Sequence, residues 1–248
     1  MSHILEIKDL QVQYHTEDGT VYALNHVDLE LDDGETLGLV GETGAGKTTL
    51  AKSIMRLIPD PPGKIEGGVI EFEGRDLLKA SGAEIRAVRG NQISMIFQDP
   101  MSSLNPVVRV GEQIAEVIRV HEKCTKKEAE EKAMEMLETV GIQAERAGDF
   151  PHQFSGGMKQ RVVIAIALAC NPKVLIADEP TTALDVTIQA QIMKLLKEIQ
   201  QKNNTAVVLI THDLGVVAGM AEYITVMYAG CIVEQGTVEE IFASPCHP

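Results

Sequence analysis

The chain has 248 residues, of which 44% are hydrophobic, and a formal net charge of −14 at pH 7. This length and composition can support a folded core, and they exclude a disordered or collagen-like chain. No apolar run reaches the roughly 18 residues that a membrane-crossing helix needs, and no secretory signal is visible at the N-terminus, so we expect a cytoplasmic location. The acidic charge argues against binding nucleic acid through its phosphates.

The cysteines are far apart and form no Cys-x-x-Cys pair. They are Cys124, Cys170, Cys231 and Cys246. This spacing argues against a zinc or iron–sulfur site within this chain, and it predicts unpaired thiols.

The N-terminal part of the chain reads as strands. Residues 4–7 and 10–14 are extended in pattern, and 27–31 alternates apolar with acidic side chains, which predicts a partly exposed antiparallel sheet. A short apolar run at 36–40 then enters a Gly-rich turn and a helix expected over 49–57, ended by the prolines that follow.

The central part of the chain is helical in pattern. Apolar residues such as Ile114, Met134 and Leu137 recur at helical spacing across 109–142. The charge run at 126–132 is typical of a solvated helix face.

After the helical part, continuous apolar strands at 174–177 and 206–210 flank a helix. Strands alternating with helices predict an α/β fold with a parallel sheet. We expect one core, formed with the β subdomain by residues 1–98 and 171–248, and an inserted helical region at 99–170.

A phosphate loop lies between the strand at 36–40 and the following helix. Its sequence, Gly41-Glu42-Thr43-Gly44-Ala45-Gly46-Lys47-Thr48, matches G-x-x-x-x-G-K-[ST]. Glycines let backbone N–H groups point at phosphate oxygens, and the helix N-terminus adds positive potential. Lys47 is predicted to reach the β- and γ-phosphates and Thr48 to bind Mg²⁺, with Thr49 beside them. An ordinary Gly-rich turn is the less specific alternative.

Two carboxylates follow the apolar strand at 174–177. Asp178 and Glu179 would lie at the strand's C-terminal end, where α/β sheets bind ligands. Asp178 is predicted to hold Mg²⁺, and Glu179 to orient or deprotonate the attacking water. Acidic pairs at strand ends are more often merely solvated, but the phosphate loop favours the catalytic interpretation.

The order of the motifs resembles that of the ATP-binding cassette (ABC) ATPases. Phe154-Ser155-Gly156-Gly157-Met158 looks like their signature motif and falls between the phosphate loop and the acidic strand end. The resemblance covers essentially the whole chain. It implies a RecA-like P-loop NTPase core with an N-terminal antiparallel β subdomain and an inserted α-helical subdomain.

The same resemblance assigns further roles. Gln98 would contact the metal or water and signal to a membrane partner, and His212 would contact the γ-phosphate. Asp185, after Ala183-Leu184, belongs to the family's set. Tyr14 would stack on adenine, with Tyr22 the weaker candidate.

The family implies a head-to-tail dimer in which each ATP lies between one subunit's phosphate loop and the other's signature motif. Ser155, Gly156 and Gly157 would then approach the γ-phosphate bound by the partner. Ser155 also fits a helix N-cap, and the two roles are compatible.

Finer similarity points to the branch that serves oligopeptide, dipeptide and nickel importers. It rests on residues 98–106 and on Phe-Ser-Gly-Gly-Met in place of the commoner Leu-Ser-Gly-Gly-Gln. This implies MgATP as cofactor, transmembrane permease subunits, an extracytoplasmic solute-binding protein and a place on the cytoplasmic face of the membrane. Members usually continue beyond this chain's last residues, Cys246-His247-Pro248, so we expect the C-terminal extension to be absent.

Two alternatives remain from the sequence. One is an ABC ATPase that acts in nucleic-acid repair or translation, against which stand the lack of a second cassette and of a basic surface run. The other is a regulatory module that only binds nucleotide, against which stand Glu179, His212 and the intact Ser-Gly-Gly.

Overall fold

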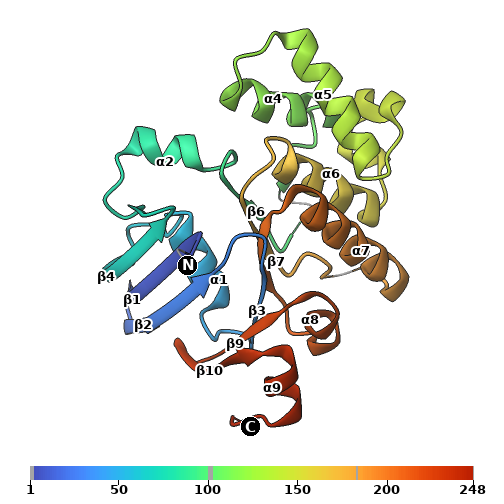
Figure 1. Ribbon diagram of the computed structural model, residues 1–248. Helices are drawn as coiled ribbons and strands as arrows, with labels where there is room; N and C mark the ends of the chain where they lie inside the picture. Colours follow the sequence, from blue (N-terminus) through green and yellow to red (C-terminus); the bar gives the residue numbers. More distant parts are fainter. Residues whose placement is uncertain (1–2, 100–102, 183, 248) are drawn as a thin grey trace. The chain divides into compact units, whose positions relative to one another are not determined.

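The computed structural model describes residues 3–99, 103–182 and 184–247 (Figure 1). The chain divides into two compact units, Met1–Arg86 with Ala206–Pro248, and Ala87–Thr205. Every residue predicted to take part in catalysis or binding lies within these ranges. Residues 100–102 and Ala183, which belong to the motifs quoted above, lie outside them. The boundaries at 99 and 170 that we expect for a helical region remain a prediction.

The first unit contains strands from both ends of the chain. Its elements are β1 (Leu5–Thr16), β2 (Gly19–Leu31), β3 (Thr36–Gly41), α1 (Lys47–Ile54), β4 (Gly63–Phe72), β5 (Arg75–Asp76), β8 (Ala206–Ile210), α8 (Leu214–Met220), β9 (Tyr223–Tyr228), β10 (Cys231–Thr237) and α9 (Val238–Ala243). Helix α2 (Gly82–Val88) crosses the boundary between the units.

An antiparallel sheet with the order β2-β1-β4-β5 forms one layer of this unit. Leu5, Ile7 and Leu10 are buried on β1; Leu5 and Ile7 alternate with the half-buried Glu6, and Leu10 follows a register shift. β1 is one continuous strand where the sequence suggested two. Asp9 takes a left-handed φ of 51° and the register shifts around it, which marks a bulge. The bulge interrupts the apolar pattern without ending the strand. The expected N-terminal antiparallel subdomain is confirmed.

A second set of strands in this unit carries the phosphate loop. Its order is β10-β9-β3-β8, and β3 runs parallel to both β8 and β9. Leu37 and Leu39 on β3 are at most 1% exposed. Such burial is typical of a parallel strand covered on both faces, and it explains why the sequence of this strand is a continuous apolar run. The parallel α/β arrangement is confirmed.

The second unit combines a parallel strand pair with helices. Its elements are β6 (Ile93–Ile96), α4 (Val110–His121), α5 (Lys126–Thr139), the 3₁₀ helices η1 (Ala144–Gly148) and η2 (Pro151–Gln153), α6 (Gly156–Leu168), β7 (Val174–Asp178) and α7 (Val186–Asn203). Strands β6 and β7 pair in parallel. Helices α4 and α5 pack side by side (Figure 1), and the helical character of this region is confirmed.

Several element bounds differ from the expectations. Helix α1 begins at Lys47 and ends at Ile54, before the prolines, because Arg56 takes a left-handed φ of 48° that a helix cannot continue. The helical stretch 109–142 is two helices, since Thr125 caps α5 with a capping box. Met134 is 36% exposed rather than buried. The charge run at 126–132 is exposed apart from Ala129, as predicted.

All four cysteines carry free thiols. Within the described residues, no helix is both long enough and apolar enough to cross a membrane.

Candidate active site

The phosphate loop links β3 to α1 in a backbone conformation that requires glycine. Gly46 caps α1 with a φ of 105°, a region that L side chains rarely adopt. A Cβ on Gly46 would lie 2.6 Å from the carbonyl oxygen of Ala23, and one on Gly41 would lie 2.1 Å from that of Met227. Both positions are therefore restricted to glycine twice over, by conformation and by close approach of another strand's backbone.

Lys47 is buried, with 7% of its surface exposed. Its Nζ donates to the carbonyl oxygens of Gly41 at 2.6 Å and Glu42 at 2.8 Å, so the ammonium lies against the loop itself. Thr48 and Thr49 follow on the first turn of α1, both half-buried. That turn has no acidic residue, so the positive potential of the helix N-terminus is uncompensated locally.

His212 follows β8, the strand next to β3. Leu39 on β3 pairs with Ile210 on β8, and the two strands run parallel. Their C-terminal ends therefore meet at one edge of the sheet, which places the phosphate loop and His212 on the same side. His212 is exposed in the turn before α8, and its neighbour Asp213 caps that helix through Gly215 N–H at 2.9 Å.

Tyr14 lies in the other sheet of the same unit. It is half-buried on β1 opposite Gly63 of β4, and a Cβ on Gly63 would lie 2.8 Å from its ring. Tyr22 on β2 is 63% exposed. Packing therefore fixes the ring of Tyr14 more firmly than that of Tyr22.

The acidic strand end lies in the second unit, at the end of β7. Asp178 is buried, 2% exposed, and Glu179 is half-buried. Gln98 follows the parallel neighbour β6, and its Nε2 donates to Oε2 of Glu179 at 2.8 Å. The structure thus joins two predicted residues that are 81 positions apart.

The signature motif forms the beginning of α6. Ser155 is its N-cap and accepts from the N–H of Met158 at 3.4 Å, which confirms the capping role expected of it. Gly156 and Gly157 form the first helical turn. Asp185 caps α7 in the same way, accepting from Ile188 N–H at 2.9 Å.

Two contact residues of these motifs escaped the sequence analysis. The Thr182 hydroxyl donates to Oε2 of Glu179 at 2.8 Å. The Arg146 guanidinium lies over the ring of Phe154 and donates to Sδ of Met158 at 3.4 Å. Neither residue belongs to a periodic pattern, although the proximity of Thr182 to Glu179 in sequence was an available signal.

The side chains predicted to bind Mg²⁺ offer oxygen donors. These are the Thr48 hydroxyl, the Asp178 carboxylate and the amide oxygen of Gln98, whose nitrogen already donates to Glu179. Among the described residues, no three His, Cys, Asp or Glu side chains cluster as a metal cage. Mg²⁺ is usually held by one or two carboxylates together with water and substrate phosphates, so the chemistry of this donor set fits it.

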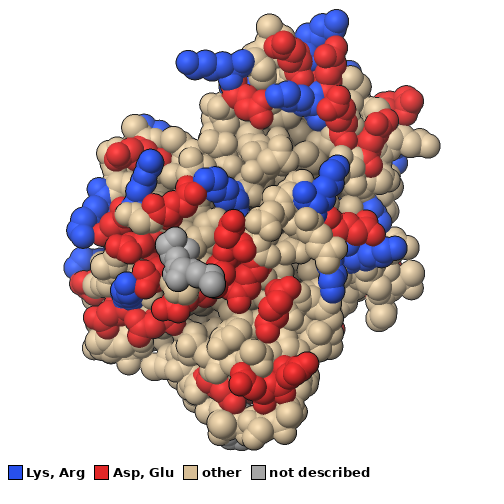
Figure 2. Space-filling model, viewed as in Figure 1, with Lys and Arg blue, Asp and Glu red and all other residues tan. Residues whose placement is uncertain are grey.

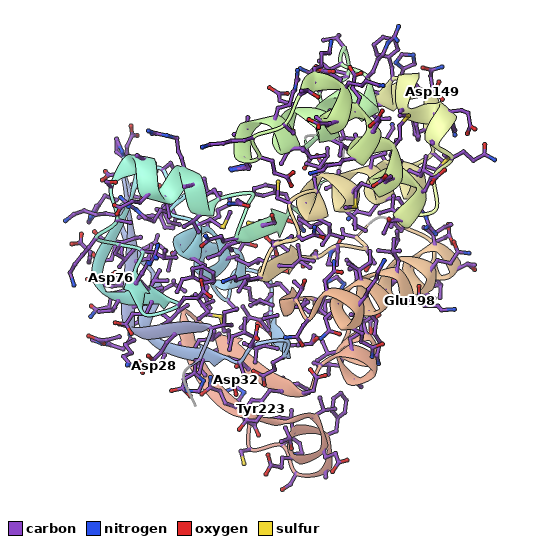
Figure 3. All side chains as sticks on the ribbon, turned by 45° about the horizontal axis from the view of Figure 1, so that its top comes forward. Asp28, Asp32, Asp76, Asp149, Glu198 and Tyr223 are labelled. Atoms are coloured by element: carbon purple, nitrogen blue, oxygen red, sulfur yellow. The ribbon has the colours of Figure 1, made fainter. Side chains whose placement is uncertain are left out.

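An acidic cavity of about 390 Å³ in the first unit is unsuited to ATP. Its lining includes Asp28, Glu30, Asp32 and Glu35, and Figure 3 labels Asp28, Asp32 and Tyr223 of it. Burial raises the pKa of the Glu35 carboxyl. Acidic side chains also gather on the face of this unit drawn in Figure 2. Like charges repel triphosphate there, so the phosphate loop is the anion site that the geometry favours.

Comparison with known proteins shows the family to which the chain belongs. A family model described as ABC transporter matches residues 24–182. The oligopeptide transport ATP-binding protein OppD of Bacillus subtilis is 57% identical, spanning 100% of this chain and 70% of OppD. The dipeptide transport ATP-binding protein DppD of the same organism is 52% identical, spanning 100% of this chain and 75% of DppD.

Solved structures show the same fold. The dimeric post-hydrolysis state of the ATP-binding cassette MJ0796, bound to ADP and Pi, has a TM-score of 0.84 and 28% identity, over 94% of this chain and 98% of that one. The chain belongs to the ABC transporter family. The resemblance drawn from the motif order and the expected P-loop fold are thereby confirmed, and the chain is an ABC-type ATPase.

Proposed function

We propose that this chain is the Mg²⁺-dependent ATPase subunit of an ABC importer for di- or oligopeptides, or for related solutes such as nickel. The observation that carries the proposal is similarity along the whole chain to oligopeptide and dipeptide transport ATP-binding proteins, at 57% and 52% identity. The phosphate loop, the acidic strand end and the Ser-Gly-Gly motif, which all stand in this sequence, support it.

The predicted motifs supply the groups that would bind MgATP. Lys47 would exchange its bonds to the loop carbonyls for oxygens of the β- and γ-phosphates, and backbone N–H groups of residues 41–48 would surround the same oxygens. Tyr14 would stack on adenine. Thr48, Asp178 and Gln98 would hold Mg²⁺, which neutralises phosphate charge when bound.

Glu179 is proposed as the general base. Its carboxylate takes a proton from water as the water oxygen bonds to the γ-phosphorus and the bond to the bridging oxygen breaks, which leaves ADP and inorganic phosphate. The bond from Gln98 at 2.8 Å supports this role because it orients the carboxylate. His212 would contact the γ-phosphate.

The transport assembly follows from the same proposal. Two nucleotide-binding subunits, identical or different, would pair head to tail, so that Ser155, Gly156, Gly157 and Asp185 complete the partner's site. Permease subunits would bind this dimer at the cytoplasmic face of the membrane, and a solute-binding protein would act on the other side. No nucleic acid is expected.

The decisive experiment is Glu179→Gln. With the general base removed, phosphate release should fall to background while ATP binding persists, and an ATP-bound dimer should accumulate in size-exclusion chromatography. Turnover at the parent rate would show that the base is wrongly assigned. A chain that binds ATP but releases no phosphate even with Glu179 intact, at high protein concentration with Mg²⁺, would instead be a passive nucleotide binder.

Identification of co-purifying proteins tests the transport assignment separately. Membrane permease subunits are expected; recovery of ribosomes or DNA in their place would favour the nucleic-acid alternative.

A further inference from the structure

The carboxylate of Glu179 accepts two hydrogen bonds on the same oxygen. Nε2 of Gln98 lies 2.8 Å from Oε2 of Glu179, and Oγ1 of Thr182 lies 2.8 Å from the same oxygen. Gln98 comes from the segment after β6, whereas Thr182 comes from the turn after β7. The two donors therefore approach one atom from different elements of the second unit.

The turn that carries Thr182 is closed by its own backbone. The N–H of Thr182 donates to the carbonyl oxygen of Glu179 at 3.2 Å. Pro180, between them, has a fixed φ that limits the turn further. Thr182 is half-buried, so its side chain has fewer rotamers and less competing water than an exposed threonine would have.

Glu179 itself has a left-handed φ of 48°. A non-glycine residue holds such a conformation only where its surroundings determine it, and such residues concentrate at functional sites. Hydrogen bonds to its side chain are one means of determining it. The conformation aims the carboxylate, and the two donors fix where its Oε2 lies.

We propose that Thr182 is a positioning residue for Glu179, whose hydroxyl holds the carboxylate in the orientation needed to take a proton from water. The inference rests on the proposed role of Glu179 as general base. Gln98 is also expected to contact metal or water, whereas the Thr182 hydroxyl is assigned no role besides its hydrogen bond to Oε2 of Glu179. Thr182 does not touch substrate in this role; it acts through Glu179.

Four variants of the 248-residue chain test this by steady-state ATPase kinetics with Mg²⁺. Thr182→Val keeps the shape of the side chain and removes the donor, so kcat should fall about tenfold, while the KM for ATP stays within about twofold. Thr182→Ser restores the donor and should recover most of kcat. Thr139→Val removes a hydroxyl that donates to the Glu135 carbonyl on α5 at 2.9 Å and should change neither constant.

The fourth variant, Glu179→Gln, separates the two proposals. If it is inactive and Thr182→Val has the parent kcat, the positioning role is wrong and the general base stands. If Glu179→Gln is active, the proposed base is wrong. If circular dichroism shows that Thr182→Val does not fold, Thr182→Ala and Thr182→Ser are compared instead. A loss of kcat in Thr182→Ala but not in Thr182→Ser supports the inference. Equal kcat in the two variants overturns it.

Discussion

The guanidinium of Arg146 lies 4.2 Å from the centre of the Phe154 ring. The same side chain donates to Asp149 at 2.8 Å and to the carbonyl oxygen of Gln153 at 3.1 Å, and to Sδ of Met158 at 3.4 Å. Phe154 and Met158 are the two positions where the signature motif departs from Leu-Ser-Gly-Gly-Gln. Both departures therefore contact one arginine, which ties the segment before α6 to its first turn.

Arg146→Ala should destabilise the chain by about 2 kcal/mol, since it removes a cation–π contact with a buried ring and several hydrogen bonds. Urea unfolding measures this. Arg119→Ala is the matched control, because Arg119 makes a part-exposed ion pair with Glu112, and such pairs contribute about 1 kcal/mol or less. Equal destabilisation by the two variants would show that the contacts of Arg146 do not organise the signature segment.

The phosphate loop permits a comparison between two glycines. Gly46→Ala combines a φ of 105° with a Cβ only 2.6 Å from a backbone oxygen, whereas Gly44→Ala at a φ of 85° meets nothing within 4 Å. Gly44→Ala should cost about 1–2 kcal/mol of backbone strain, and Gly46→Ala more, because the backbone has to shift. The unfolding temperature and the affinity for a fluorescent ATP analogue should both be lower for Gly46→Ala than for Gly44→Ala. The reverse order would refute the argument from backbone contact.

The region around the phosphate loop shows which structural features could be predicted from the sequence. The strand, the Gly-rich turn and the helix around Lys47 were predictable because a buried strand and a motif of fixed spacing are local signals. The end of α1 at Ile54 was not, because a left-handed φ at Arg56 leaves no pattern. The start of β2 at Gly19 was missed as well, since the first five residues of this strand are mostly exposed and do not alternate.

Contacts between distant segments were the least accessible. The sequence supplied both Gln98 and Glu179 as candidates, but their hydrogen bond depends on the pairing of β6 with β7. The hydrogen bond from Thr182 to Glu179 forms at a residue with a left-handed backbone conformation, and no residue type in this segment predicts that conformation. Motif order therefore identified Gln98 and Glu179, but the contacts of Glu179 with Gln98 and with Thr182 follow from the backbone.

The cysteines should differ strongly in reactivity. Burial raises the pKa of the Cys170 thiol to about 11, while Cys246 is exposed. The thiolate is the reactive form, so at pH 8 about one Cys170 thiol in a thousand is ionised. Iodoacetamide labelling followed by peptide mass spectrometry should modify Cys246 well before Cys170, and the Cys170 rate should rise about tenfold per pH unit. Equal rates in the folded chain would contradict the burial argument.

Gly156→Ala separates a requirement of the fold from a requirement of the partner's nucleotide. A Cβ at Gly156 would lie 3.8 Å from Leu184 Cδ2, an ordinary contact, whereas one at Gly157 would lie 2.7 Å from Ile188 Cγ2. Gly156→Ala should therefore keep the parent unfolding temperature. If Gly156 approaches the γ-phosphate bound by a partner subunit, the added methyl should nonetheless lower ATPase activity at least tenfold and weaken ATP-dependent dimerisation. Gly157→Ala should lower the unfolding temperature as well, because Ile188 has to move. Parent activity in Gly156→Ala would exclude a close approach of its backbone to the partner's ATP.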